Sequence, residues 1–141
     1  MKPSVAYLLA PVLGFMTAQT LKYVLASTRE KNWRQFFRSG SMPSSHTAVV
    51  VSLATVIYAH AGFTELFAVV AVLTMITVYD ALVARRSIGE QGTALIRLIE
   101  KSSFAKDPLP RVALGHKPRE VLVGAVLGIV LGIIVALFIT I

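Results

Sequence analysis

Four long apolar runs alternate along the chain with shorter segments that carry most of its charged residues. The runs extend over residues 5–26, 47–61, 66–84 and 121–141. A helix needs about 20 consecutive apolar residues to cross a bilayer core, so we expect each run to form a membrane helix, the second being short for a full span. The sequence therefore predicts an all-α, polytopic membrane bundle of about four transmembrane helices, in a single domain over residues 1–141.

Two of the connecting segments have the composition of interfacial helices. Residues 29–38 place Trp33, Phe36 and Phe37 among basic side chains, a spacing typical of an anchor at the membrane surface. Residues 87–104 show a helical but only moderately apolar periodicity. We expect this second segment to form an amphipathic helix along the membrane surface, and Pro108 and Pro110 to end it.

Composition supports a membrane protein and excludes several other classes. Hydrophobic residues make up 55% of the chain and the mean hydropathy is +0.72, far above the soluble range. The net charge of +7 comes from basic residues in short loops between apolar runs rather than on a helix or strand with interleaved aromatics, so membrane topology explains it better than nucleic-acid binding. The chain has no cysteine, which excludes disulfides, thiolate metal sites and cysteine nucleophiles. The first apolar run lacks a convincing cleavage site and is interpreted as a retained helix.

The charge distribution predicts the orientation. Lysines and arginines populate the first and third connecting segments, and the second has none, so both basic segments should be cytoplasmic. Both termini then lie outside, in the periplasm if the protein belongs to a bacterial inner membrane. The end of the first helix, the start of the second, the end of the third and the start of the fourth consequently meet at one face. The residues with catalytic or binding chemistry at that face are Lys22, Ser44, Ser45, His46, Asp80, Arg85, Arg86, His116 and Glu120.

The start of the second apolar run resembles an anion-binding helix N-terminus. Pro43 suits a first helical turn, and Ser44 and Ser45 can cap the free backbone N–H groups or turn them toward a bound oxyanion. His46 would then face the bound group. The alternative is that the serines only cap the helix and His46 is an interfacial polar residue.

Two carboxylates stand near basic side chains at the same face. Asp80 lies in the last turns of the third run, where it needs a partner: Arg85 or Arg86 can form an ion pair with it, or Asp80 can support a phosphate-binding arginine. Glu120 follows His116 by four residues, so on a helix its carboxylate can orient and charge-stabilise the imidazole. This second pair has the chemistry of a nucleophile and its orienting group.

These segments carry a family resemblance. The string P-S-S-H at Pro43–His46 resembles the P-S-G-H signature of the type-2 phosphatidic acid phosphatase and vanadium haloperoxidase superfamily, and His116-xxx-Glu120 resembles its H-xxx-D ending. The strings GSMPSSHTA, YDALVARRSIG and LGHKPREV resemble a small, divergent membrane branch of it. The resemblance implies a helical phosphatase that uses no metal or cofactor and forms a phosphohistidine. By position, His116 would be the nucleophile, Glu120 its orienting carboxylate and His46 the general acid, with Ser44 and Ser45 binding phosphate.

The chain departs from the superfamily pattern at two elements. The K-x6-R-P element has two candidates, Lys22 to Arg29 and Lys31 to Arg38, and neither is followed by proline; we favour Lys22. The expected S-R pair is replaced by Leu109 and Pro110, so Arg85 and Arg86 are expected to supply the missing guanidinium from the third helix. The histidines and carboxylates show no close metal-ligand spacing, so no metal is expected.

The function that these features predict is hydrolysis of a lipid phosphomonoester at the cytoplasmic face. By analogy, phosphatidylglycerol phosphate is the first substrate expected, and a prenyl phosphate or diphosphate the next. One alternative is a transporter that binds an anion or phosphorylated lipid without cleaving it. Another is a non-catalytic assembly protein, because Gly124, Gly128 and Gly132 form a ridge suited to close helix packing, either within the subunit or in a homo-oligomer.

Overall fold

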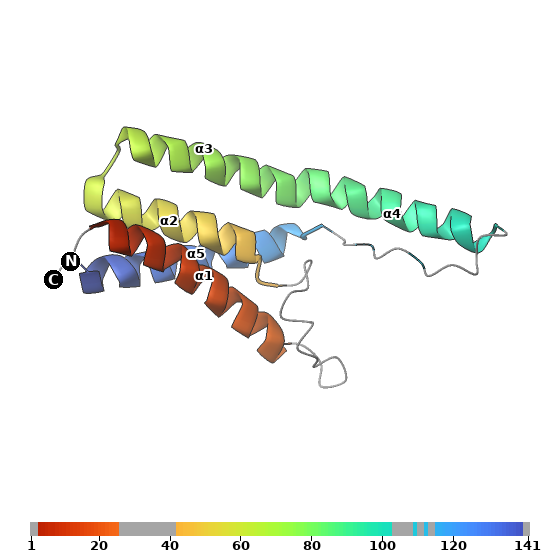
Figure 1. Cartoon of the computed structure of the whole chain (residues 1–141), viewed down its shortest axis with the longest axis horizontal. Coiled ribbons are helices and arrows are strands. Elements are labelled where there is room, and N and C mark those ends of the chain that lie inside the picture. The colour runs from red at the N-terminus through yellow and green to blue at the C-terminus, as the bar shows by residue number, and fades with distance from the viewer. Residues whose placement is uncertain (1–2, 26–41, 103–108, 110–111, 113–114, 140–141) are drawn as a thin grey trace.

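The computed structural model describes residues 3–25, 42–102, 109, 112 and 115–139, and this part of the chain is all-α. The helices are α1 (Pro3–Leu25), α2 (Ser45–Ala61), α3 (Glu65–Tyr79), α4 (Arg85–Glu100) and α5 (Pro118–Ile139). A π-helical segment, η3 (Asp80–Ala84), joins α3 to α4. Residues 65–100 therefore form one continuous helix, and the described residues make up four helical rods (Figure 1).

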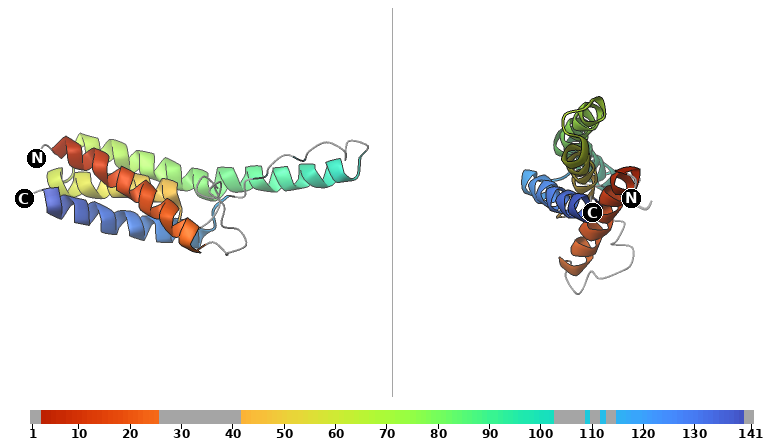
Figure 2. Two further views of the ribbon diagram at one scale, coloured as in Figure 1. Left: turned by 60° about the horizontal axis from the view of Figure 1, so that its bottom comes forward. Right: turned by 90° about the vertical axis from the view of Figure 1, so that its left-hand side faces the viewer.

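α2 is the central helix of the bundle. It packs against α1, α3 and α5, and α1 also packs against α5. Both termini lie at one end of the bundle, whereas the end of α1 and the starts of α2 and α5 lie at the other (Figures 1 and 2). The predicted gathering of these helix ends at one face is thus seen in the structure.

Three of the four rods are long and apolar enough to cross a membrane: α1, residues 65–100 and α5. α2 is apolar but has only 17 residues, which corresponds to about 26 Å of helix against a bilayer core of about 30 Å. Of the about four transmembrane helices predicted, three are thus candidate membrane spans by length and composition, and α2 is a shorter apolar helix. Its side chains Ala48, Val56 and Ile57 are almost completely buried by the surrounding helices.

The glycine ridge of α5 packs against α2 of the same chain. A Cβ atom at Gly128 would lie 2.8 Å from the Ala48 carbonyl oxygen, and one at Gly132 would lie 2.6 Å from the Thr55 Cβ. Gly124 approaches the Ser44 backbone in the same way. Of the two roles that the sequence leaves open for the ridge, packing within the subunit is the one that the structure shows.

The expected surface helix over residues 87–104 is not a separate element. α4 continues α3 through η3, and Figure 2 shows it extending along the same direction beyond the ends of the other helices. The physical reason is that no proline or glycine stands between Tyr79 and Ser87 to interrupt the helix. The side chains of Ile88, Leu95 and Leu98 on α4 remain exposed.

The start of α2 also differs from the expectation in one detail. The helix begins at Ser45 with Ser44 as its N-cap, so Pro43 precedes the helix and does not occupy its first turn. The predicted interfacial anchor over residues 29–38 lies outside the described residues, and so do Pro108 and Pro110.

Candidate active site

His116 and Glu120 form a pair at the start of α5. Pro118 is the first residue of the helix, where its missing N–H is tolerated. His116 Nδ1 lies 3.0 Å from Glu120 Oε2, and the same oxygen accepts the Lys117 backbone N–H at 3.1 Å. The side chains are 3% and 12% exposed. When Glu120 is ionised it can only accept this hydrogen bond, and a neutral His116 imidazole then carries its proton on Nδ1 and has its lone pair on Nε2.

The backbone of His116 is held by the π-helical segment. In an α-helix the Arg85 N–H would donate to the Ala81 carbonyl, but here it donates to Asp80, five residues earlier. The Ala81 carbonyl instead accepts the His116 N–H at 3.2 Å. Single π-helical turns inside α-helices are frequent at functional sites, and this one provides the acceptor for the predicted nucleophile's backbone.

Gly115 allows this contact because it has no side chain. A Cβ atom there would lie 2.6 Å from the Arg86 Cα and would also clash with the Arg86 nitrogen. Sequence reasoning missed Gly115 and Ala81 as site residues. A glycine immediately before His116 was the available signal for the first, and no side-chain pattern reveals the second, because Ala81 acts through its carbonyl.

Ser44 connects the starts of α2 and α5. Its Oγ accepts the Thr47 N–H at 3.4 Å and bonds the Thr47 hydroxyl at 2.9 Å, and its own N–H donates to the Glu120 carbonyl at 2.9 Å. The residue is completely buried. Of the two roles predicted for Ser44, helix capping is the one that these contacts show.

Lys22 and Ser45 bring α1 and α2 together beside this pair. The Lys22 ammonium donates to Ser45 Oγ at 3.1 Å, and the lysine is only 7% exposed. The Glu120 carboxylate acts electrostatically on Lys22. The buried Lys22 side chain therefore lies within electrostatic reach of the His116–Glu120 pair. The alternative basic pair Lys31 and Arg38, and also Arg29, lie outside the described residues.

His46 is exposed in the first turn of α2. It lines a cavity of about 250 Å³ together with Thr77, Asp80 and Arg85, among others. The charged groups that act on its imidazole are Arg85, His116, Lys22 and Asp80. His46, the predicted general acid, therefore lies within electrostatic reach of His116, the predicted nucleophile.

Each of the two arginines at the α3–α4 junction is paired with a carboxylate. Arg85 Nε lies 2.6 Å from Asp80 Oδ2, and Arg86 Nε lies 3.1 Å from Glu90 Oε1. The predicted ion pair of Asp80 is therefore confirmed, with Arg85 as the partner. The structure separates the two arginines, because Arg85 lines the cavity of His46 and Arg86 lines the cavity of His116.

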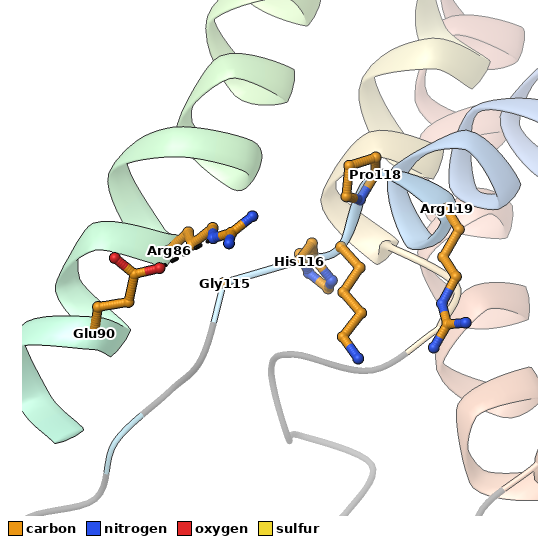
Figure 3. A pocket seen from close by; sticks show the side chains of 7 residues that line it. Arg86, Glu90, Gly115, His116, Pro118 and Arg119 are labelled. Carbon is orange, nitrogen blue, oxygen red and sulfur yellow. Dashed lines mark hydrogen bonds and ion pairs between the residues drawn. The ribbon is translucent and has the colours of Figure 1, made fainter.

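The cavity beside His116 is the larger, at about 580 Å³. The residues that line it are Arg86, Glu90, Gly115, His116, Lys117, Pro118 and Arg119. Figure 3 shows Arg86 extending from α4 toward the segment that carries Gly115 and His116, with Arg119 on the opposite side, on α5. The two histidines therefore line different cavities at the same end of the bundle.

No group of three or more potential metal ligands from His, Cys, Asp and Glu occurs within the part of the chain that the structure describes. The site is built from two histidines, a carboxylate on one of them, a buried lysine, a serine hydroxyl and two arginines. Such groups can bind a phosphate and transfer it to an imidazole nitrogen.

Comparisons with known proteins place the chain in a family. Residues 4–131 match the Divergent PAP2 family. The chain is also similar to the uncharacterized membrane protein YuiD of Bacillus subtilis (strain 168), at 36% identity over 93% of this chain and 94% of the relative. No solved structure matches the chain at a significant level. Because the family match covers most of the chain and includes both histidine segments, this membrane protein belongs to the Divergent PAP2 family.

Proposed function

We propose that the protein is a phosphatase that removes a phosphate from a membrane lipid through a phosphohistidine on His116. The observation that carries the proposal is the buried contact between His116 Nδ1 and Glu120 Oε2 at 3.0 Å. This contact leaves Nε2 as the free nitrogen and stabilises the positive charge that the ring gains when it attacks.

The first chemical step is transfer of the phosphoryl group. Nε2 of His116 attacks phosphorus, a P–N bond forms and the P–O bond to the lipid breaks. The leaving alkoxide takes a proton from His46. Support for this role of His46 comes from its position in the exposed first turn of α2, at the end of the bundle where α5 also begins. The substrate phosphate would have to lie between the two cavities, within reach of both imidazoles.

The second step regenerates the enzyme. Water attacks the phosphohistidine, its proton passes to the now neutral His46, the P–N bond breaks and inorganic phosphate leaves. Lys22, the Ser45 hydroxyl and Arg85 are the proposed donors to the phosphate oxygens in both steps. Arg85 pairs with Asp80 through Nε, and its guanidinium has two further nitrogens that can donate.

A lipid is the proposed substrate because the site lies at the end of an apolar helical bundle. Side chains such as Leu122, Leu137 and Val69 are exposed along the outside of the helices, as expected for a surface in contact with acyl chains. Phosphatidylglycerol phosphate is the first candidate and a prenyl phosphate or diphosphate the second. The excess of basic residues at this end favours a cytoplasmic orientation of the site and external termini.

The test is phosphate release by the purified protein in mixed micelles, with excess chelator present. Phosphatidylglycerol phosphate, phosphatidate and a prenyl phosphate are offered separately, and His116→Ala is compared with the wild type. Glu100→Gln, an exposed substitution at the far end of α4, serves as the matched control. We expect chelator-resistant release that is lost in His116→Ala and kept in the control. Absence of release from every lipid by folded protein would contradict the proposal and favour a binding or assembly role.

A further inference from the structure

We propose that the cavity beside His116 binds a second phosphate group of the lipid, so that the protein selects headgroups with two phosphates. This inference rests on the proposed function, because it assigns the substrate class of the same site. The residues assigned to the second phosphate are Lys117 and Arg119, at the start of α5, with Arg86 of α4. Glu90 holds Arg86 in place.

The cavity beside His116 carries an excess of positive charge. Among the described residues that line it, three have cationic side chains and Glu90 has the single carboxylate. Glu90 is paired with Arg86, and no ion pair of Lys117 or Arg119 occurs among the described residues. In the cavity of His46, by contrast, Arg85 and Asp80 balance one another. The excess positive charge is therefore confined to the side of His116.

The positive charge of the cavity beside His116 exceeds what the proposed phosphoryl transfer needs. The reacting phosphate has Lys22, Ser45 and Arg85 as proposed donors. At about 580 Å³, the cavity of His116 is within the usual range for small-molecule sites, whereas the other cavity, at about 250 Å³, is below it. A second anionic group has both space and unused cations beside the nucleophile.

The placement of these cations around His116 also supports a second phosphate site. Lys117 is adjacent to His116 in sequence, and cations from two different helices approach His116 from two sides, Arg86 from α4 and Arg119 from α5 (Figure 3). A second phosphate could be linked to the first directly, as in a diphosphate, or through a short carbon chain, as in a phosphomonoester beside a phosphodiester. Either linkage presents a second phosphate group to Arg86, Lys117 and Arg119.

A general attraction of basic residues to an anionic membrane would act differently. It would raise the local concentration of every anionic lipid and would not discriminate between headgroups. Discrimination between one and two phosphates is therefore the quantity to measure.

The experiment compares kcat/KM for matched lipids: phosphatidylglycerol phosphate against phosphatidate, and a prenyl diphosphate against the prenyl monophosphate. We expect the wild type to prefer the two-phosphate member of at least one pair, and the pair that shows the preference identifies the linkage. In the double variant Lys117→Ala/Arg119→Ala the preference should fall about 10–100-fold, as expected for loss of charge-assisted hydrogen bonds. Both residues are exposed, so folding should be kept. Arg97→Ala, an exposed substitution on α4 outside the cavity, should leave the preference unchanged.

The outcomes separate the two proposals. Equal kcat/KM within both pairs in the wild type, or an unchanged preference in the double variant, would overturn the second-phosphate site and leave the phosphatase in place. If none of the four lipids is hydrolysed, the proposed function itself is overturned.

Discussion

Glu120 accepts two hydrogen bonds on one oxygen, from the His116 imidazole at 3.0 Å and from the Lys117 backbone at 3.1 Å. Both donors belong to the segment that leads into α5, and Glu120 lies in the first turn of that helix, so the local geometry at the helix start orients the carboxylate and the imidazole. The pair is thus formed by contacts within one short segment. Preorganisation of this kind reduces the reorganisation needed during the reaction.

Replacing Glu120 by Gln should lower kcat by about 10²–10⁴-fold, the range expected when a group that supports proton transfer is lost. Glutamine keeps the size of the side chain but removes the negative charge that stabilises the imidazolium. Single-turnover and steady-state phosphate release would measure the effect, with Glu100→Gln as the control. Retention of wild-type kcat in the glutamine variant would contradict the catalytic role proposed for the His116–Glu120 pair.

Replacing Gly115 by Ala should reduce kcat while the bundle remains folded. The added Cβ would meet the Arg86 backbone, which cannot move as a flexible side chain can. The His116 segment must shift instead, and a displacement of about 1 Å can lower a rate by about 10²-fold. Gly92→Ala is the comparison, since its Cβ would meet the end of the Val112 side chain at 2.9 Å. Equal kcat values for the two variants would argue against this positioning role.

Replacing Lys22 by Gln should lower kcat/KM by about 10–100-fold, because a charged donor to the phosphate is lost. Lys22 is buried and donates to Ser45 at 3.1 Å, so its ammonium is held where the phosphate would bind. The matched control is Lys101→Gln, an exposed lysine after α4. Activity in the Lys22 variant equal to that of the control would exclude Lys22 from the site.

Replacing Gly128 by Ala should destabilise the fold by about 1–3 kcal/mol, the usual range for overpacking. Its Cβ would lie 2.8 Å from the Ala48 carbonyl, so α2 and α5 must separate. Thermal unfolding in detergent would measure the change. Val126→Ile adds a carbon at an exposed position of the same helix and should leave the unfolding temperature unchanged. Unchanged stability of Gly128→Ala would mean that the α2–α5 contact tolerates a wider spacing.

Much of the architecture follows from the sequence. The apolar runs located the helices to within a few residues, since helix length and burial in lipid depend on local composition. The four-residue spacing of His116 and Glu120 predicted their contact, although the structure places His116 just before α5 and only Glu120 on the helix. The basic loops predicted which helix ends share a face.

Other features depend on contacts between distant segments. Whether the glycine ridge faces α2 or a second subunit is decided by how α5 packs, which no local pattern encodes. The same holds for Asp80, for which Arg85 and Arg86 were equally plausible partners until the π-helical turn placed them on different sides. The continuity of α3 with α4 was missed because the change from apolar to amphipathic composition resembled a boundary, although nothing there breaks a helix.

The sequence by itself determined the membrane character, the helical segments and the residue types of the site, because these follow from composition and from spacing within one helix. Only the tertiary structure decided that the Ser44 N–H reaches the Glu120 carbonyl, that Lys22 reaches Ser45 and that the Ala81 carbonyl holds His116. These contacts join residues far apart in the chain, and their existence depends on the relative placement of α1, α2, η3 and α5.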